Sequence, residues 1–338
     1  MDQNNNFTIK PKYCGYLEGH SGAITSIVTG HSNTDGKEND ILVTGSRDKT
    51  LIIWKINHDL ERNEEAAFGE PFISLTGHNH FISDLSLSQD QAHLLSSSWD
   101  KSLRLWSLKT GKCVKRFSHP SQKEILSTTF SPDGRQIFSS GCDTKLSLWN
   151  TKGEFILSSE KQGHYDWASK IRHSLSAKNK FYASVGWDGK LKIWTEFFKL
   201  SQTVNAHEGP IYALAISNNG SYIATGGKDQ LIRLWKLGEF DKPIKEFKCD
   251  SNVVDLAFHP EMQWLAAATE NSIGFYEIIG ENEKPFGQEK PVKRTSSKIE
   301  GTPKFTSLAW SHTGKYLYTG ASDSFVRVYQ INVNSDNA

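Results

Sequence analysis

The sequence is poor in cysteine, and the cysteines it has lie far apart. Its 338 residues include four cysteines and no CxxC pair. This spacing argues against a zinc site and against a disulfide scaffold, and it is typical of a reducing intracellular compartment. We therefore expect a fold that neither metal nor disulfides hold together.

An excess of charge of one sign and long apolar runs are also missing. The chain carries 39 basic and 38 acidic residues, a formal net charge of +1, so only a local basic patch is expected to bind nucleic acid. No apolar run approaches the roughly 18 residues of a membrane-spanning helix. The N-terminal MDQNNNF is polar and acidic rather than secretory. These absences favour a cytoplasmic chain without a membrane span.

What the sequence does contain is an internal repeat. Six times an Asp is followed after six residues by Trp or Tyr and preceded four residues earlier by Ser or Thr. The sets are Thr44, Asp48 and Trp54; Ser96, Asp100 and Trp106; Ser139, Asp143 and Trp149; Ser184, Asp188 and Trp194; Thr225, Asp229 and Trp235; and Thr319, Asp323 and Tyr329. A worn copy, WLAAATENSIGFYEI, puts Ala266, Glu270 and Tyr276 in these places. The first five Asp residues are spaced 52, 43, 45 and 41 residues apart, close to the WD-repeat period of about 40 to 45 residues.

This period predicts an all-β protein, a seven-bladed β-propeller of WD repeats that forms a single domain over residues 1–338. The blades should cover about 15–333, with a loop at 279–303 between blades six and seven. FISDLSL, HLLSSS, SLRLWSL and KCVKRF predict the four strands of one blade. The N-terminal segment FTIKPKYCGYL, residues 7–17, is expected to close the ring beside 325–331 and so to remove a free strand edge.

The repeated polar residues suggest a network inside each blade. A buried Asp must be paired, because an unpaired buried carboxylate is very costly. A His can donate to the Asp, a Ser or Thr can link to the His, and the Trp N–H can complete the network. The predicted tetrads are His20, Thr44, Asp48 and Trp54; His78, Ser96, Asp100 and Trp106; His164, Ser184, Asp188 and Trp194; and His207, Thr225, Asp229 and Trp235, with His119 as the corresponding His of the third repeat.

Catalytic chemistry is not expected from these residues. Ser, His and Asp together also form hydrolase triads, but a nucleophile site occurs once, whereas this set recurs with a Trp in each copy. No GxGxxG or Walker-type loop is present, and no HxxxH or carboxylate cluster suggests a metal. We predict a protein that is not an enzyme and has no cofactor. Trp99 and Trp187, which precede tetrad Asp residues, are interpreted as turn aromatics that serve either partners or the fold.

One turn carries two cations. Arg47 and Lys49 flank Asp48 in SRDKT, and two cations on a stiff turn suit phosphate. Lys10 and Lys12 are expected nearby, because the N-terminal strand should adjoin the first blade. The plainer interpretation is a solvated charge pair.

Several stretches are similar to the receptor for activated C kinase, a family of WD-repeat scaffolds of the small ribosomal subunit. They include SRDKTLIIWK (46–55), GHNHFISDLSLS (77–88), SWDKSLRLW (98–106), VGWDGKLKIW (185–194), GGKDQLIRLW (226–235) and SSKIEGTPKFTSLAWS (296–311). The resemblance covers nearly the whole chain. It also places the worn sixth repeat and the 279–303 loop where that family has them.

The resemblance implies a cytoplasmic, non-enzymatic scaffold, monomeric on the ribosome. It would contact ribosomal RNA and ribosomal proteins and recruit signalling proteins such as protein kinase C. The family's basic pair corresponds to Arg47 and Lys49, with Lys10, Lys12 and Lys101 as further candidates. The alternatives are a WD-repeat adaptor of another complex, in ubiquitin ligation or chromatin, and a G-protein β-like subunit. A G-protein β subunit would have a long N-terminal helix that pairs with a γ subunit, but the 18 residues before Gly19 contain Pro11 and no heptad.

Overall fold

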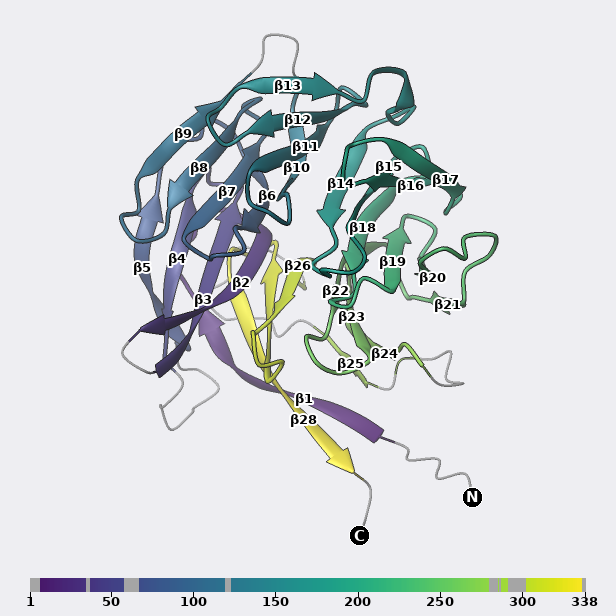
Figure 1. Ribbon diagram of the computed structural model, residues 1–338. Coiled ribbons are helices and arrows are strands. Elements are labelled where there is room, and N and C mark those ends of the chain that lie inside the picture. Colours follow the sequence, from purple (N-terminus) through teal and green to yellow (C-terminus); the bar gives the residue numbers. More distant parts are fainter. Residues whose placement is uncertain are drawn as a thin grey trace.

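Seven four-stranded antiparallel sheets form the protein (Figure 1). The computed structural model describes residues 7–34, 37–57, 67–118, 123–279, 285, 287–290 and 302–335. The inner strands contact one another in sequence, from β2 through β6, β10, β14, β18, β22 and β26 and back to β2. This succession closes the sheets into a ring, so the predicted seven-bladed all-β propeller is confirmed.

Six blades take their strands in chain order from the inside outward. The first three consist of β2 (Ile24–Thr34), β3 (Lys37–Ser46), β4 (Leu51–Ile56) and β5 (Gly69–Leu75); β6 (Ile82–Leu87), β7 (His93–Ser98), β8 (Leu103–Ser107) and β9 (Cys113–Phe117); and β10 (Ile125–Phe130), β11 (Gln136–Gly141), β12 (Leu146–Asn150) and β13 (Phe155–Ser158). The next three consist of β14 (Ala168–His173), β15 (Phe181–Gly186), β16 (Lys190–Thr195) and β17 (Leu200–Asn205); β18 (Ile211–Ile216), β19 (Tyr222–Gly227), β20 (Leu231–Lys236) and β21 (Lys245–Lys248); and β22 (Val253–Phe258), β23 (Trp264–Thr269), β24 (Ile273–Glu277) and β25 (Gly287–Glu289). A 3-10 turn, η1 (Glu160–Gln162), leads into the fourth blade.

The seventh blade joins the two ends of the chain. It consists of β26 (Phe305–Trp310), β27 (Tyr316–Ala321) and β28 (Val326–Ser335), with β1 (Phe7–Leu17) as its outer strand. β1 pairs antiparallel with β28 from Phe7 opposite Ser335 to Leu17 opposite Val326. The predicted closure by the N-terminal segment is therefore confirmed, and Figure 1 shows the two strands side by side.

One part of the predicted loop is a strand. Within 279–303, β25 pairs with β24 and supplies the fourth strand of blade six, so the expectation of a loop throughout was wrong there. Its three-residue sequence, Gly287–Glu289, has no alternating apolar pattern by which it could be recognised. Much of the rest of 279–303 lies outside the described residues.

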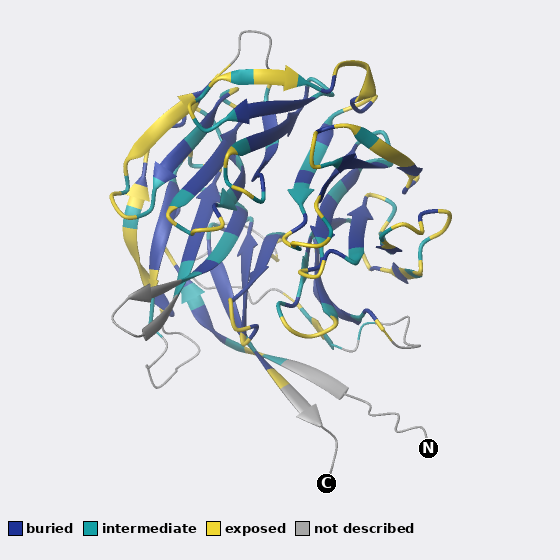
Figure 2. Cartoon of the chain, in the orientation of Figure 1, coloured by how far each residue is buried: buried dark blue, intermediate teal, exposed yellow. Residues whose placement is uncertain are grey.

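Apolar clusters fill the spaces between neighbouring blades. One cluster combines Leu17 and Val328 of blade seven with Leu42, Ile52 and other residues of blade one. Equivalent clusters lie between the other neighbours. Each fully buried aliphatic side chain contributes about 1.5–3 kcal/mol. Figure 2 shows the result, buried inner and middle strands with exposed outer ones such as β9.

Every inner strand carries a β-bulge after its first residue. The register shifts at Ile82/Asp84 in β6 and at the same place in the other six inner strands. A bulge bends a strand and increases its twist. Its repetition gives each blade the same bend near the axis, and the residue after each bulge occupies the same position in all seven blades. Of the described residues, no helix is long and apolar enough to cross a membrane.

Deleting residues 1–17 should lower the free energy of unfolding by several kcal/mol. The deletion exposes the edge of β28 and removes the buried side chains of Cys14 and Leu17 from the blade interface. Thermal unfolding should show a clear fall in Tm. Deletion of residues 1–6, which removes none of the paired positions, is the matched control, and equal Tm values for the two deletions would contradict the closure argument.

Candidate functional site

Four blades hold the same chain of hydrogen bonds. In blade one, the Trp54 indole donates to the Thr44 hydroxyl at 2.8 Å, the His20 Nε2 lies 2.8 Å from that hydroxyl, and His20 Nδ1 lies 2.8 Å from Asp48. Three further sets are joined in the same way, with distances of 2.8–3.0 Å: His78, Ser96, Asp100 and Trp106; His164, Ser184, Asp188 and Trp194; and His207, Thr225, Asp229 and Trp235.

The chain of bonds fixes the proton on each histidine. An indole N–H can only donate, so the hydroxyl accepts from it and gives its own proton to His Nε2. Nδ1 of the neutral imidazole must then carry the hydrogen and donate to the carboxylate. Such bonds polarise one another. The hydrogen bond from the His to the Asp connects the turn before each of these blades to the turn between its second and third strands.

The same geometry resembles a hydrolytic triad but cannot act as one. Ser96 and Ser184 are fully buried, and each hydroxyl already bonds to an indole and an imidazole. A substrate carbonyl therefore has no path to either oxygen. Among the described residues, no group of three His, Cys, Asp or Glu side chains is placed to hold a metal ion.

The tetrad carboxylates of Asp48 and Asp100 are ionised. Burial by itself would raise the pKa of Asp48, but the hydrogen bonds from His20 and Thr50 outweigh it and hold that pKa well below its usual range. Asp48 also accepts from the backbone N–H groups of Ser21 and Thr50. Asp100 behaves in the same way with His78 and Ser102. Each carboxylate thus fixes both of the turns that meet beside it.

Blades three and seven depart from this arrangement. His119 lies outside the described residues, and Asp143 accepts only the backbone N–H of Lys145 among those described, so burial raises its pKa. In blade seven the fully buried Arg327 takes the place of the histidine and pairs with Asp323 at 2.5 and 3.0 Å.

The worn sixth blade differs by one residue from the spacing of the Ser/Thr and aromatic positions in the other repeats. The turn between β23 and β24 is one residue shorter than that between β19 and β20, and the register pairs Leu265 with Tyr276. Ala267, rather than Ala266, therefore occupies the Ser/Thr position. The carboxylate comes instead from the preceding loop, where Asp250 accepts from Thr269 and Ser272 at 2.8 and 3.0 Å.

A second polar network, which the sequence did not reveal, joins four inner strands. Asp84 of β6 is fully buried and bonds to Ser26 of β2, Ser127 of β10, and Arg172 and Lys170 of β14. Burial would raise the pKa of Asp84, but the two cations outweigh it and keep the carboxylate charged. Several of these residues follow the bulges of their strands. This network holds the first four blades together around the axis.

Arg47 and Lys49 project from the β3–β4 turn that Asp48 fixes. Lys49 adopts a left-handed φ of 73°, as do the residues after four other anchor Asp side chains of the repeat: Lys101, Thr144, Gln230 and Ser324. The Arg47 guanidinium lies 5.5 Å from the Phe81 ring centroid. Among the described residues, no carboxylate lies within ion-pair distance of Arg47 or Lys49. The turn therefore carries two exposed cations on a backbone that Asp48 holds in place.

The other predicted basic residues are not gathered at this turn. Lys101 occupies the equivalent turn of blade two, where its ammonium pairs with Glu124 at 3.5 Å. Lys12 lies opposite Gln330 in the register of β1 and β28. It comes five residues before Leu17, the last residue of β1, and is therefore about 16 Å from Leu17 along the strand. Lys10 lies two residues further, opposite Asn332, and its side chain is outside the described part of the chain. The expected grouping with Arg47 and Lys49 is therefore not seen.

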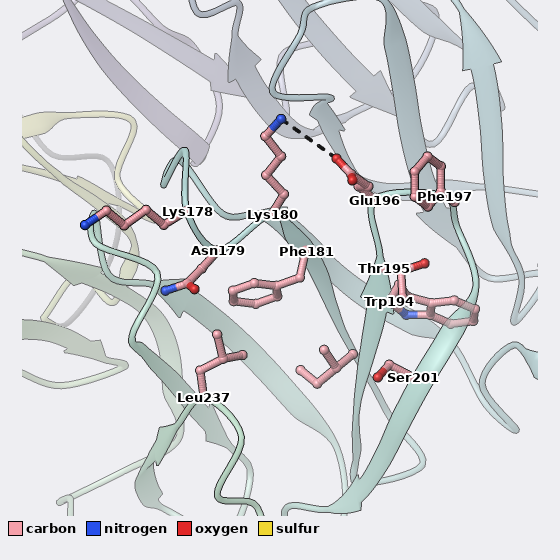
Figure 3. Close-up of a pocket in the computed structure, with 11 residues that line it drawn as sticks. Lys178, Asn179, Lys180, Phe181, Trp194, Thr195, Glu196, Phe197, Ser201 and Leu237 are labelled. Carbon is pink, nitrogen blue, oxygen red and sulfur yellow. Dashed lines mark ion pairs between the residues drawn. The ribbon is translucent and has the colours of Figure 1, made fainter.

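A pocket of about 480 Å³ lies between blades four and five (Figure 3). Phe181 and Leu237 contribute apolar surface to it, and Lys180 pairs with Glu196 at its rim at 3.9 Å. Lys178 also lines the pocket and has no ion-pair partner among the described residues.

Comparison with known proteins gives the family. The profile described as "WD domain, G-beta repeat" matches six segments: 11–55, 69–107, 111–150, 198–236, 241–276 and 294–330. The chain belongs to the WD-repeat family and is RACK1-like. It is 38% identical over 322 residues to "Cross-pathway control WD-repeat protein 2" of Flammulina velutipes, which covers 95% of this chain and 98% of that protein.

Two relatives share a further name. "Small ribosomal subunit protein RACK1" of Neurospora crassa is 38% identical, over 94% of this chain and 96% of its own. The protein of the same name from Caenorhabditis elegans is 36% identical, over 96% of this chain and 98% of its own. The resemblance to the receptor for activated C kinase is thereby confirmed. The 151–197 region, which the WD-repeat profile does not match, nevertheless contains most of blade four.

The tetrad network should make blades unequal in their response to mutation. Asp100→Ala leaves the donors of His78 and Ser102 without an acceptor and should cost about 3 kcal/mol. Asp143→Ala removes a poorly partnered carboxylate and should cost less than about 1 kcal/mol. Urea unfolding of the two variants measures the difference, and equal losses would refute the assigned role of the histidine.

Stability should fall in mild acid. Burial lowers the pKa of His78 and His207, and burial with the neighbouring Arg172 lowers that of His173 to about 4. An unfolded imidazole titrates near about 6.5, so below that pH the unfolded chain binds more protons than the folded one. The free energy of unfolding must then decrease as pH falls from about 6.5 toward 4.

Urea midpoints measured across this window test the expectation. His173→Gln should flatten part of the pH dependence, because it removes one of the three imidazoles. A midpoint that does not change across the window would contradict the buried, neutral state of these histidines.

Proposed function

We propose that this protein is a non-enzymatic scaffold that binds the small ribosomal subunit, with Arg47 and Lys49 holding phosphates of ribosomal RNA. The observation that carries the proposal is a pair of cations on one rigid turn, neither of them matched by a carboxylate among the described residues. Relatives named as small ribosomal subunit proteins, aligned over nearly the full length, support it. In this proposal the protein is cytoplasmic and acts as a monomer on the ribosome.

The chemistry of the two side chains fits phosphate. A guanidinium presents a planar fork that binds two phosphate oxygens at once, and an ammonium adds a compact point charge. The Phe81 ring supports the Arg47 guanidinium from one side, and hydrogen bonds to Asp48 hold the turn that carries both. Little conformational entropy is lost when such a site binds its ligand.

The remaining basic candidates play a smaller part in the proposal. Glu124 shares the charge of Lys101, so that lysine offers less to a phosphate. Lys12, and Lys10 two residues before it, lie on β1 and not on the blade-one turn. We assign these two lysines to contacts with ribosomal proteins rather than to the phosphate site.

The outer strands leave surface for other partners. The outer strand β9 is largely exposed (Figure 2). Phe72 on β5 and Ile156 on β13 are also exposed. A scaffold held at one turn keeps these edges available. We propose that they recruit signalling proteins, protein kinase C among them, to translating ribosomes.

Reversing both charges, Arg47→Asp with Lys49→Asp, should release the protein from small subunits without unfolding it. Both side chains are exposed, and neither takes part in a tetrad. Sucrose-gradient cosedimentation at low and high salt measures the effect. For every phosphate that the variant no longer neutralises, the salt dependence of binding should also flatten by about 0.7–0.9 log units per decade.

Lys109→Asp with Lys112→Asp is the matched control. It makes the same change of charge on the turn between β8 and β9, at the opposite end of a blade. Wild-type cosedimentation of the Arg47/Lys49 variant, or equal losses for the two pairs, would refute the phosphate-binding role of these two residues. A wild-type protein that does not cosediment with small subunits would contradict ribosome binding itself and favour a WD-repeat adaptor of another complex.

A further inference from the structure

A row of aromatic side chains runs across the face of the ring that carries Arg47. His80 stacks on Trp99 with ring centroids 5.9 Å apart, and Trp99 meets Trp167 edge-on at 6.3 Å. Trp167 lies 4.3 Å from Trp187, which contacts Tyr212 at 6.3 Å. These five residues, the aromatic row, link blades two, four and five.

The sequence of blade three makes this row continuous. Trp99 and Trp187 directly precede tetrad Asp residues, and Cys142 occupies the same position in blade three. The small, buried thiol leaves the space in which Trp99 of blade two reaches Trp167 of blade four. Tyr212 is the residue that the bulge in β18 leaves unpaired, which accounts for its place at the end of the row.

The row is held in position before any partner arrives. The backbone N–H of Trp99 donates to the carbonyl oxygen of Phe81 at 3.1 Å, and that of Trp187 donates to the carbonyl oxygen of Trp167 at 2.8 Å. Their neighbours Asp100 and Asp188 are locked by His78 and His164. Even so, Trp99 is 36% exposed. A rigid aromatic surface that solvent reaches costs little entropy when it binds.

Cations lie at both ends of the row. Arg47 stands over Phe81, whose ring centroid is 4.4 Å from that of His80, and Lys49 is on the same turn. In blade five, the exposed Lys228 occupies the position before Asp229 that Trp99 and Trp187 have before their own Asp residues. Among the described residues, Lys49 and Lys228 have no ion-pair partner.

We propose that the aromatic row binds a segment of single-stranded RNA, with bases stacked on Trp99 and its neighbours and phosphates held by Arg47 and Lys49. Aromatic faces flanked by unmatched cations suit unpaired nucleic acid, because each base offers a π-face and each phosphate a charge. Duplex RNA keeps its bases stacked inside and would use only the cations. The inference rests on the proposed function through Arg47, which both share.

Binding of a labelled single-stranded oligouridylate to the purified full-length chain, followed by fluorescence anisotropy, tests the proposal. Trp99→Ala should weaken binding roughly tenfold, while Trp99→Phe should retain most of it, because only the first variant removes a stacking partner of a base. Binding of a duplex RNA should not change in either variant. Phe197→Ala is the matched control, since Phe197 is 85% exposed on the turn at the other end of β16.

A second variant distinguishes RNA from a cationic peptide. Asp166 is exposed beside Trp167 and accepts the Trp167 backbone N–H. Asp166→Asn removes a negative charge from the row, so it should strengthen binding of an RNA strand, whereas a basic peptide would bind more weakly. A gain in oligouridylate affinity supports the proposal.

Unchanged oligouridylate affinity in Trp99→Ala, or equal losses in Trp99→Ala and Phe197→Ala, would overturn it. Circular dichroism and Tm must show that Trp99→Ala is folded. If it is not, the oligouridylate affinity of Trp99→Phe is measured instead, and a loss of most binding in that variant would contradict stacking on residue 99. Cosedimentation of Trp99→Ala with small subunits keeps the two proposals apart, because ribosome binding that survives loss of oligouridylate binding leaves the proposed function standing. Loss of ribosome binding in the Arg47/Lys49 reversal alone, with oligouridylate binding intact, would overturn the inference as well.

Discussion

A carboxylate inside a β-blade must be matched by donors, and the rest of this disc depends on that requirement. Removing the charge from water is expensive unless several hydrogen bonds replace the lost solvent. Four blades meet the need with an imidazole, a hydroxyl and an indole in a fixed order of donation. Blade seven uses a buried guanidinium, and blade six moves the carboxylate to another loop. Different residues thus satisfy one electrostatic condition.

The same condition explains why the candidate site is stiff. The residues on either side of a fixed Asp have little freedom, so the side chains at those positions point outward from a defined backbone. In blade one they are two cations, and in blades two and four the preceding residue is a tryptophan. Rigidity inside the blade therefore becomes pre-organisation on its rim. The function of the rim can change with one residue while the network beneath it stays the same.

Much of this architecture was accessible from sequence because the repeat is periodic. The spacing of Asp48 and Trp54, and of their counterparts, predicted the blades, and the N-terminal segment predicted the closure. Contacts between different repeats were not accessible. Asp84 finds its partners on β2, β10 and β14, and Trp99 meets Trp167 across an intervening blade. No local spacing encodes such pairs, since the curvature of the ring brings them together. The placement of Lys12 was wrong for a related reason, because the direction of β1 carries it away from the rim.

The pairing of β1 with β28 has a consequence for synthesis of the chain. β1 pairs with β28, so its hydrogen-bonding edge must wait until the six intervening blades have been translated. Contacts so distant in sequence form slowly, and unpaired edges attract other chains in the meantime. The nascent propeller is thus an open arc with two unpaired strand edges. These edges must be kept from pairing with other chains until the ring closes.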